Sequence, residues 1–452
     1  MNVTILDEQS MKNKFFARNE KQFLDFISKY DDQMVSTMKR KGFTYIHSME
    51  RTVVFTFGEI TIRRRRWKKG NEWAVPVDEK LGLERNTRFS LEFMYQISQL
   101  ATMMPYDKVV QVIELLYQVY ITKPTVVKAV KLCGQLLDEK KEYRYFRDEE
   151  KHSDEKKKPD IIYIEGDGVW VKSRHDDSDQ KNHDLSHFLV HTGSKQTGSN
   201  RFSLQDKKEF ISVSRLNAKE QLMDYLYNHF EIQPHTLLIT NSDGGPGYSP
   251  GIFKDIAKAL KVRRHEHFWD VYHLNQELKD FFRKYPKELS NLAFQSIQEH
   301  NRSKLLTALD SAESLISTKE EQEGFRKFKS KLLNNFQYTK PAELRGLESA
   351  GIGVMESQHR KVTYRMKNRG MYWSLAGADT MSQMIVLTYE GNFRDLFFGS
   401  WREEYRKIEE INSVTGGTIF EQSKQETEAN DVRKLNLKKR YIAKTGFVRK
   451  LR

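Results

Sequence analysis

The sequence predicts an α/β protein: a mixed β-sheet core that is interrupted by an all-helical insertion and preceded by a β-hairpin with helices. Three observations predict this class. Between residues 160 and 273, short β-branched and aromatic runs alternate with amphipathic helical patterns. Residues 274–336 carry helical spacing alone. Near the start of the chain, apolar positions alternate through residues 53–57 and 60–62 on either side of Gly58, as they do in a hairpin.

The composition narrows the class of protein. Lys and Arg number 76 against 62 for Asp and Glu among 452 residues, so the net charge is +14 and the pI about 9.4. This charge favours a polyanionic partner such as nucleic acid, although a basic enzyme of another kind would share it. A single cysteine, Cys133, excludes a disulfide framework and a Cys-x-x-Cys zinc site. With no apolar run of about 18 residues and no signal peptide, we expect a soluble intracellular protein without a membrane partner.

The N-terminal part has helical spacing over residues 1–42 and then the hairpin, which runs into a strongly cationic stretch. Six cations surround Trp67 there, and they are candidates for contacts with DNA phosphates. The candidate residues are Arg63, Arg64, Arg65 and Arg66. The alternative is an edge strand whose charges only keep it in solution.

Residues 89–137 return to helical spacing, with a break before Pro124, which is well placed in the first turn of the next helix. Two helices joined by a short turn are typical of a helix-turn-helix whose second helix enters the major groove. Lys123, Thr125 and Lys128 would then contact DNA. Any small helical bundle would show the same pattern.

The central part predicts three strands, a helix, a strand, a helix and a strand, which is the order of an RNase H-like core. The strands are expected within residues 160–174, 187–191, 209–214, 236–240 and 265–273, and the helices at 217–230 and after Ser249.

Two acidic residues occupy unusual places in this core. Asp167 interrupts a strand in which apolar residues are expected, and Asp243 follows the strand at 236–240. An ionised carboxylate there is costly unless a cation stabilises it. In an RNase H-like core the first and fourth strands are neighbours, so these aspartates would meet although 243 − 167 = 76 positions separate them. Oxygen ligands suit Mg²⁺ or Mn²⁺, and two such ions would serve phosphodiester chemistry.

An alternative metal site would use His265, His267 and His273, provided that one straight strand carries all three. Packing or contact with DNA is the simpler interpretation of these histidines.

The third acid is expected on a helix that follows the insertion. Glu343 and Glu348 lie in a glycine-rich stretch that predicts a loop, and a loosely held carboxylate would position metal poorly. Glu356 opens a segment with helical apolar spacing at Met355 and Val362, so we expect Glu356 to complete the site. The alternative is that Glu356 is only a carboxylate at a helix N-terminus, where the dipole favours it.

Basic residues on this same helix can face the substrate, and Arg360, Arg365 and Arg369 are the candidates for DNA contact. The predicted domain boundaries follow from these patterns. They are a DNA-binding region at 1–137, a charged linker at 138–159, the core at 160–273, a helical insertion at 274–345, the rest of the core at 346–410 and a basic tail at 411–452.

Four motifs together carry a resemblance to a known family. They are Ile164–Val169, Asn241–Gly245, Trp269–Leu274 and Arg369–Ser374. With them the chain resembles the ISLre-type insertion-sequence transposases, formerly an uncharacterised protein family, from the hairpin to about residue 373. The N-terminal arm lacks cysteines, so the zinc-supported DNA binding of related families is not available here.

The resemblance implies a DDE-type transposase, with Mg²⁺-dependent hydrolysis at the ends of a mobile element and transfer of the freed 3′-hydroxyl to target DNA. Asp167, Asp243 and Glu356 would be the catalytic and metal-binding acids. The implied partners are the terminal inverted repeats, the target DNA and further copies of the chain in a dimer or larger oligomer. The implied location is the bacterial cytoplasm, at the nucleoid.

Two other classes stay open at this point. A metal-dependent nuclease or resolvase of the same fold would cleave DNA without joining strands. A DNA-binding regulator descended from a transposase would bind DNA without cleaving it.

Overall fold

The structure is a computed structural model, and it describes residues 6–147, 156–174, 181–199, 201–245, 247–349 and 351–412. None of the described helices is long and apolar enough to span a membrane. Apart from its first two positions, the predicted basic tail at 411–452 lies outside the described residues.

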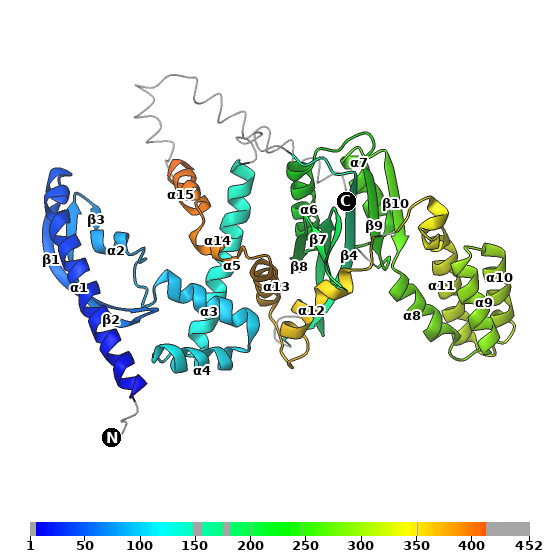
Figure 1. The fold of residues 1–452 in the computed structure, drawn as a ribbon, viewed down its shortest axis with the longest axis horizontal. Coiled ribbons are helices and arrows are strands. Elements are labelled where there is room, and N and C mark those ends of the chain that lie inside the picture. Colours follow the sequence, from blue (N-terminus) through cyan, green and yellow to red (C-terminus); the bar gives the residue numbers. More distant parts are fainter. Residues whose placement is uncertain are drawn as a thin grey trace.

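A mixed sheet of five strands forms the centre of the described structure (Figure 1), in the order β10-β9-β4-β5-β8. The strands are β4 (Ile161–Lys172), β5 (Asn182–His191), β8 (Lys208–Ser212), β9 (Leu237–Ser242) and β10 (Arg264–Trp269). β4 pairs in parallel with β9 and antiparallel with β5. β9 and β10 are parallel, and β5 and β8 are antiparallel. The predicted pairing of the first strand with the fourth is therefore confirmed.

One hairpin in this region was not expected. β6 (Gly193–Gly198) and β7 (Arg201–Gln205) form a separate antiparallel pair between β5 and β8. Its side chains are largely exposed, so the hairpin lacks the apolar alternation by which strands are recognised in a sequence.

Helices cover both faces of the sheet. α6 (Arg215–His229) and α7 (Pro250–Ala259) pack on one face, against Ile162 and Ile164 of β4 among others. α12 (Met355–Met366) and α13 (Leu375–Tyr389) pack on the other. Successive side chains of a strand point to opposite faces. Odd-numbered residues of β4 therefore point towards α12.

A helical bundle packs against the face of the sheet that α12 and α13 cover, and one apolar core is common to both. The bundle consists of α3 (Leu91–Met103), α4 (Tyr106–Tyr117), α5 (Lys123–Arg147), α14 (Phe393–Phe398) and α15 (Trp401–Asn412). One continuous apolar cluster joins α3–α5 to α13–α15 and to Val169 and Val171 of β4. The bundle is built from residues 91–147 and 393–412, and α5 continues across the predicted boundary after residue 137.

The predicted linker at 138–159 also needs correction. Its first ten residues continue α5, and Tyr143 is 4% exposed, with its ring 6.1 Å from that of Trp401. The sequence pattern of a charged linker thus belongs to a helix that buries Tyr143 on one side. Residues 148–155 lie outside the described part of the chain.

The N-terminal region has a small core of its own. The long helix α1 (Glu8–Arg40) packs on the hairpin of β1 (Thr44–Phe55) and β2 (Gly58–Lys69), which confirms the hairpin. β3 (Glu72–Ala74) and α2 (Pro76–Lys80) complete it. Gly58 adopts a φ of 134°, a conformation that residues with a side chain rarely adopt.

The helical insertion follows β10 directly and contains four helices within the described residues 271–335, not three. They are α8 (Val271–Phe282), α9 (Lys287–Gln298), α10 (Arg302–Glu313) and α11 (Lys319–Asn335). The 3-10 turns η1 (Phe336–Thr339) and η2 (Glu343–Arg345) lead back to the sheet. His273, expected on a strand, lies in the first turn of α8, because the carboxylate of Asp270 accepts the His273 N–H at 3.0 Å and begins a helix there.

Buried histidines make the fold sensitive to acid. His191 is 1% exposed, and burial lowers its pKa to about 4, whereas the unfolded chain keeps a value of 6.5. A neutral histidine of this kind stabilises the fold above its unfolded pKa, and that contribution is lost as the pH falls from 6.5 towards 4.

Between about pH 7.5 and about pH 5, the wild type should therefore lose about 2 kcal/mol of unfolding free energy through His191. We expect His191→Phe to avoid this loss, because phenylalanine does not titrate and retains the ring that stacks on Tyr163. Urea unfolding at the two pH values measures this loss. His235→Phe, at an exposed position, is the control and should change nothing. An identical loss in the wild type and in His191→Phe would contradict the expectation.

Candidate active site

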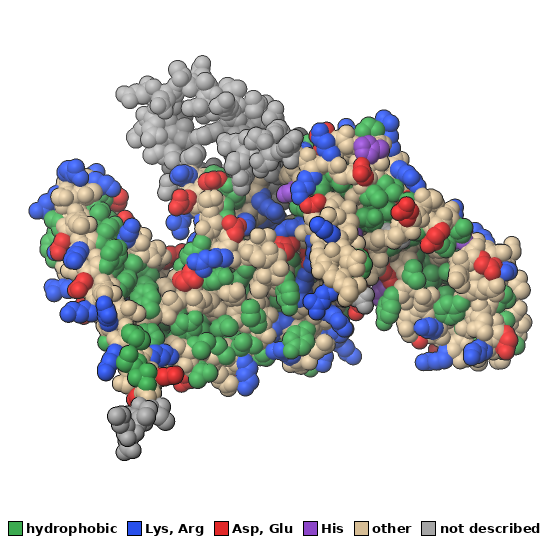
Figure 2. All heavy atoms as spheres, viewed as in Figure 1, with side chains coloured by type: hydrophobic (Ala, Val, Ile, Leu, Met, Phe, Trp, Pro, Cys, Tyr) green, Lys and Arg blue, Asp and Glu red, His purple; other side chains and the backbone are tan. Residues whose placement is uncertain are grey.

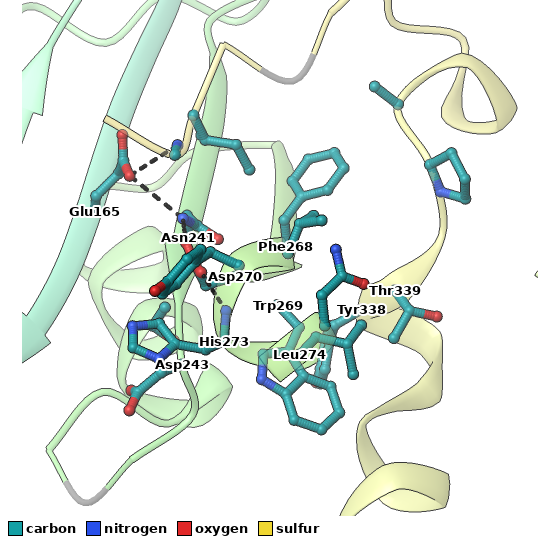
Figure 3. Close-up of a pocket in the computed structure, with 18 of the residues that line it drawn as sticks. Glu165, Asn241, Asp243, Phe268, Trp269, Asp270, His273, Leu274, Tyr338 and Thr339 are labelled. Atoms are coloured by element: carbon teal, nitrogen blue, oxygen red, sulfur yellow. Dashed lines mark hydrogen bonds between the residues drawn. The ribbon is translucent and has the colours of Figure 1, made fainter. Parts of the chain in front are cut away.

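A cavity of about 730 Å³ opens where the middle of β4 and the carboxyl ends of β9 and β10 meet the helical insertion and the start of α12. Figure 3 shows Glu165, Asn241, Asp243 and His273 on the sheet side of this cavity, with Tyr338 and Thr339 across it. The carboxylates that line it are those of Glu165, Asp167, Asp243, Asp270, Glu343, Glu348 and Glu356. All three acids expected from the sequence therefore line one cavity.

Asp167 and Asp243 are brought together by strand pairing. Gly166 of β4 is in register with Ser242 of β9, and the two aspartates come next on these parallel strands. Burial raises the pKa of Asp243, and the negative charge of Asp167 raises it further, although the N–H of Gly245 opposes this shift by donating to Asp243 Oδ1 at 2.8 Å. Two carboxylates that repel each other in this way favour a cation between them.

Two histidines contact Asp167. Its Oδ2 lies 3.6 Å from His273 Nε2 and 3.7 Å from His359 Nδ1, while its Oδ1 accepts the N–H of Gly168 at 2.7 Å. Burial alone would raise the pKa of Asp167, but the contact with His273 and the charge of His359 hold it below its usual value.

His273 supplies a positive charge to this site. Its contact with Asp167 outweighs burial, and the charges of Asp167, Asp270 and Asp243 help to raise its pKa to about 9. At neutral pH the imidazole is therefore protonated, and the aspartate pair already attracts one cation.

His359 is a site residue that the sequence reasoning missed. It lies three positions after Glu356, one turn along the same helix face, and this spacing is the signal that could have revealed it. Burial lowers its pKa to about 4, and its ring stacks on that of His187 with centroids 5.2 Å apart. His187 Nε2 contacts Glu209 Oε2 at 2.9 Å, so a buried polar chain lies beneath α12.

Glu356 lies in the first turn of α12, so the predicted helix at this position is confirmed. Its side chain is exposed and lines the cavity. Glu343 lies in η2 and Glu348 in the irregular segment after it, and both also line the cavity. The glycine-rich pattern predicted their irregular backbone but not their place beside the aspartates.

The donors of the cavity suit a hard divalent cation, because they are carboxylate oxygens. Among the described residues, no group of three or more His, Cys, Asp or Glu side chains is arranged to hold a metal ion. Asp167 and Asp243 could therefore serve as two ligands of a metal ion. For Glu356 to be the third, its exposed side chain would have to turn towards them.

The alternative histidine cluster is wrong. The hydroxyl of Thr240 contacts both His265 Nε2 and His267 Nδ1 at 2.8 Å. His273 lies on α8 and contacts Asp167 instead.

Comparison with known proteins places the chain in a family. A model of the uncharacterised protein family UPF0236 matches residues 1–404. The chain belongs to this family. A relative from Streptococcus gallolyticus, described as "UPF0236 protein in vanSb 3'region", is 31% identical over 383 residues, which are 84% of this chain and 80% of the relative.

One solved structure that resembles this UPF0236 chain is a "Drosophila P element transposase strand transfer complex". The match covers 75% of this chain and 90% of the other at 10% identity, with a TM-score of 0.24. A score this low does not establish a common fold.

Two of the four hairpin arginines of this UPF0236 chain serve the N-terminal fold. Arg64 is 6% exposed and its Nε lies 2.7 Å from Asp78 Oδ1, and Arg65 pairs with Asp31 and Asp32 of α1 at 3.0 and 2.8 Å. The prediction of Arg64 as a DNA contact is therefore wrong, because its side chain is buried in an ion pair with α2. Arg65 is half-buried beside α1, and its contact with DNA stays a prediction. Trp67 is buried as well.

Of the other two hairpin arginines, Arg63 is exposed, and Arg66 is half-buried and lies over the ring of Trp73 at 3.9 Å. Figure 2 shows Lys and Arg side chains gathered over this N-terminal region and around α12.

The helix-turn-helix candidates lie at the start of α5. Lys123 and Lys128 are exposed and Thr125 is half-buried, whereas Val126 and Ala129 between them are in the core of the bundle. α5 thus has an exposed face at its first turns, and contact of this face with DNA stays a prediction.

Arg365 was predicted to contact DNA and is instead buried. It is 1% exposed, its Nε donates to the carbonyl oxygen of Ala101 at 2.8 Å, and its guanidinium lies 5.3 Å from the ring centroid of Trp373. Burial lowers its pKa to about 10. Of the other candidates on or near α12, Arg360 is exposed, and Arg369 is half-buried and lies over the ring of Tyr364 at 4.6 Å.

Arg365 and Arg360 give a matched pair on one helix. We expect Arg365→Ala to lower the free energy of unfolding by about 3 kcal/mol, because it removes a buried hydrogen bond and the packing of a long side chain. Arg360→Ala should leave stability unchanged within about 0.5 kcal/mol. Denaturant unfolding measures both values, and equal stabilities of the two variants would contradict this assignment.

Proposed function

We propose that this UPF0236 chain is a DDE-type DNA transposase that cleaves phosphodiester bonds at the ends of an insertion sequence and joins them to target DNA. The observation that carries the proposal is the meeting of Asp167, Asp243 and Glu356 at one cavity. These residues come from two strands and a helix that are 76 and 356 − 243 = 113 positions apart.

The sheet supports the assignment of its core as RNase H-like. The first strand of that fold is central, with the second strand antiparallel on one side and the fourth parallel on the other, as β4 lies between β5 and β9 here. The helical insertion lies between the last strand, β10, and the helix with the third acid, α12. This placement agrees with the proposed role of Glu356.

The chemistry follows from the donor set. Two bound Mg²⁺ or Mn²⁺ ions would activate the attacking oxygen and stabilise the leaving oxygen of an in-line displacement. The chain fixes the ligands: the N–H groups of Gly168 and Gly245 hold Oδ1 of Asp167 and Asp243, while Oδ2 of Asp167 already faces a cation, His273. His273 also lies where its positive charge can contact a phosphate oxygen.

The negative charge of the cavity implies that metal ions bind there before the scissile phosphate does. Seven carboxylates line it, and they repel a DNA phosphate until cations neutralise them. Duplex DNA is held elsewhere, by basic side chains such as Arg63, Lys123, Lys128 and Arg360. Entry of the scissile phosphate should therefore require metal, whereas overall binding of the element ends should not. The terminal repeats and the target would be held by a dimer or larger oligomer of the chain.

The aspartates can be tested without changing the basic surface. We expect Asp167→Asn or Asp243→Asn to remove Mg²⁺-dependent cleavage of plasmid DNA that carries the sequences flanking the gene, with loss of at least about 100-fold in rate. Gel-shift affinity for the same DNA should stay within about threefold. Cleavage by either variant at the wild-type rate would contradict the metal-site hypothesis.

The third acid has its own matched control. We expect Glu356→Gln to abolish nicking and Glu348→Gln to leave it largely intact, because only Glu356 is on a helix that packs on the sheet. The reverse result in a Mg²⁺-supported nicking assay would move the third ligand to the segment before α12.

The products separate the proposal from its alternatives. A transposase yields strands joined to target DNA, so joined products should appear when the flanking DNA and a target plasmid are incubated with the chain and Mg²⁺. Cleavage without joining would identify a nuclease or resolvase. Specific binding without cleavage would identify a regulator.

A further inference from the structure

Glu165 is a buried carboxylate with no Lys or Arg nitrogen within 4.0 Å in the part of the chain that the structure describes. It lies two residues before Asp167 on the same face of β4 and is 0% exposed. The nearest basic side chain among the described residues is that of His191, whose Nε2 lies 4.0 Å from Glu165 Oε1. Burial lowers the pKa of this imidazole to about 4, so it is neutral at pH 7. A carboxylate in such surroundings is costly unless hydrogen bonds stabilise it.

The hydrogen bonds come from the start of α12. The N–H of Gly353 donates to Glu165 Oε2 at 2.9 Å, the N–H of Val354 donates at 3.2 Å, and the N–H of Met355 donates at 3.4 Å. The first N–H groups of a helix have no acceptor within the helix. α12 has no side-chain cap of its own at Val354, so a strand carboxylate from 188 to 190 positions earlier takes that role.

The same carboxylate is tied to the neighbouring strands. Asn241 of β9 donates through Nδ2 to Glu165 Oε2 at 3.3 Å and to Asp270 Oδ2 at 3.0 Å. Asp270 in turn accepts the N–H of His273 at the start of α8. Figure 3 shows this row of contacts on the sheet side of the cavity. One polar network thus joins the first turns of α12 and α8 to the adjacent strands β4 and β9.

Glycine allows the chain before α12 to approach the sheet. Gly351 has a φ of +64°, and a Cβ there would lie 2.5 Å from the ring of Tyr163, which is closer than two atoms can pack. The segment that leads into α12 is therefore pressed against β4 on the face that carries Glu165.

We propose that Glu165 is a positioning residue that fixes the first turn of α12 to β4 and so sets where Glu356 stands relative to Asp167. Asn241 orients the Glu165 carboxylate and extends the same restraint to α8. This inference rests on the proposed function in one respect, which is that Glu356 binds metal. The attachment of α12 by Glu165 does not depend on it.

Hydrogen exchange tests the attachment by itself. Glutamine has nearly the shape of glutamate but lacks its charge and one acceptor oxygen, so in Glu165→Gln the amides of residues 353–355 should exchange about tenfold faster than in the wild type. Asp379→Asn is the matched control, because Asp379 ties α13 to β8 through the N–H of Val213 at 2.8 Å and the hydroxyl of Ser212 at 2.7 Å. It should leave exchange at 353–355 unchanged. Unchanged exchange in Glu165→Gln would overturn the inference.

Mn²⁺ titration tests the consequence for the site. Glu165→Gln should weaken Mn²⁺ binding by about 10- to 100-fold, as loss of a residue that orients a metal ligand does. In the Glu356→Gln background the same change should have an effect within about twofold, because a residue that acts through Glu356 has nothing left to position. Asp379→Asn should again have no effect. Full additivity of the two changes would overturn the positioning role.

Two outcomes separate this inference from the proposed function. If the wild type binds Mn²⁺ and Asp167→Asn abolishes binding while Glu165→Gln binds normally, the inference fails and the proposed function stands. If the wild type binds no Mn²⁺, the proposed function fails together with the metal-positioning role, while the exchange data still decide the attachment of α12. Should Glu165→Gln fail to fold, Glu165→Asp is the second variant, because it keeps the charge but withdraws the oxygens by one methylene length. It should lose exchange protection at residues 353–355 and Mn²⁺ affinity as well, each to a smaller extent.

Discussion

The repulsion between two partly buried carboxylates is the constraint on which the site depends. The parallel pairing of β4 with β9 brings Asp167 and Asp243 together. Burial and the charge of Asp167 raise the pKa of Asp243, whereas His273 and His359 hold the pKa of Asp167 below its usual value, so the pair is stabilised by positive charge. His273 on α8 supplies one such charge, and a divalent ion would supply more.

The remaining elements hold this centre in place. α12 is joined to the sheet at its start by Glu165 and, one turn on, by the stacked rings of His359 and His187 above Glu209. These contacts are buried, so α12 cannot move without exposing several polar groups that have lost their partners. Glu356 lies between the two attachments, in the first turn of the helix. Its exposed side chain is therefore free to rotate on a backbone that is fixed.

Sequence patterns predicted the strands and their partners better than they predicted individual contacts. Alternation and the order of elements were enough to place Asp167 beside Asp243, because sheet topology is set by the burial of whole strands. Arg64 and Arg365 were misassigned because a basic residue has the same appearance in a sequence whether it is exposed or pairs inside the fold. His359 was missed because its neighbours in space, on β4 and β5, are more than 150 positions away. Contacts of this kind emerge only when the chain is folded.

The central claim is that Asp167, Asp243 and Glu356 form one divalent-metal centre. The most direct measurement is anomalous X-ray scattering from crystals of the protein grown with Mn²⁺. The account predicts an anomalous peak within about 2.5 Å of carboxylate oxygens of Asp167 and Asp243, with Glu356 turned towards it. Mn²⁺ bound only at other residues, or no peak at this cavity at saturating Mn²⁺, would contradict the account.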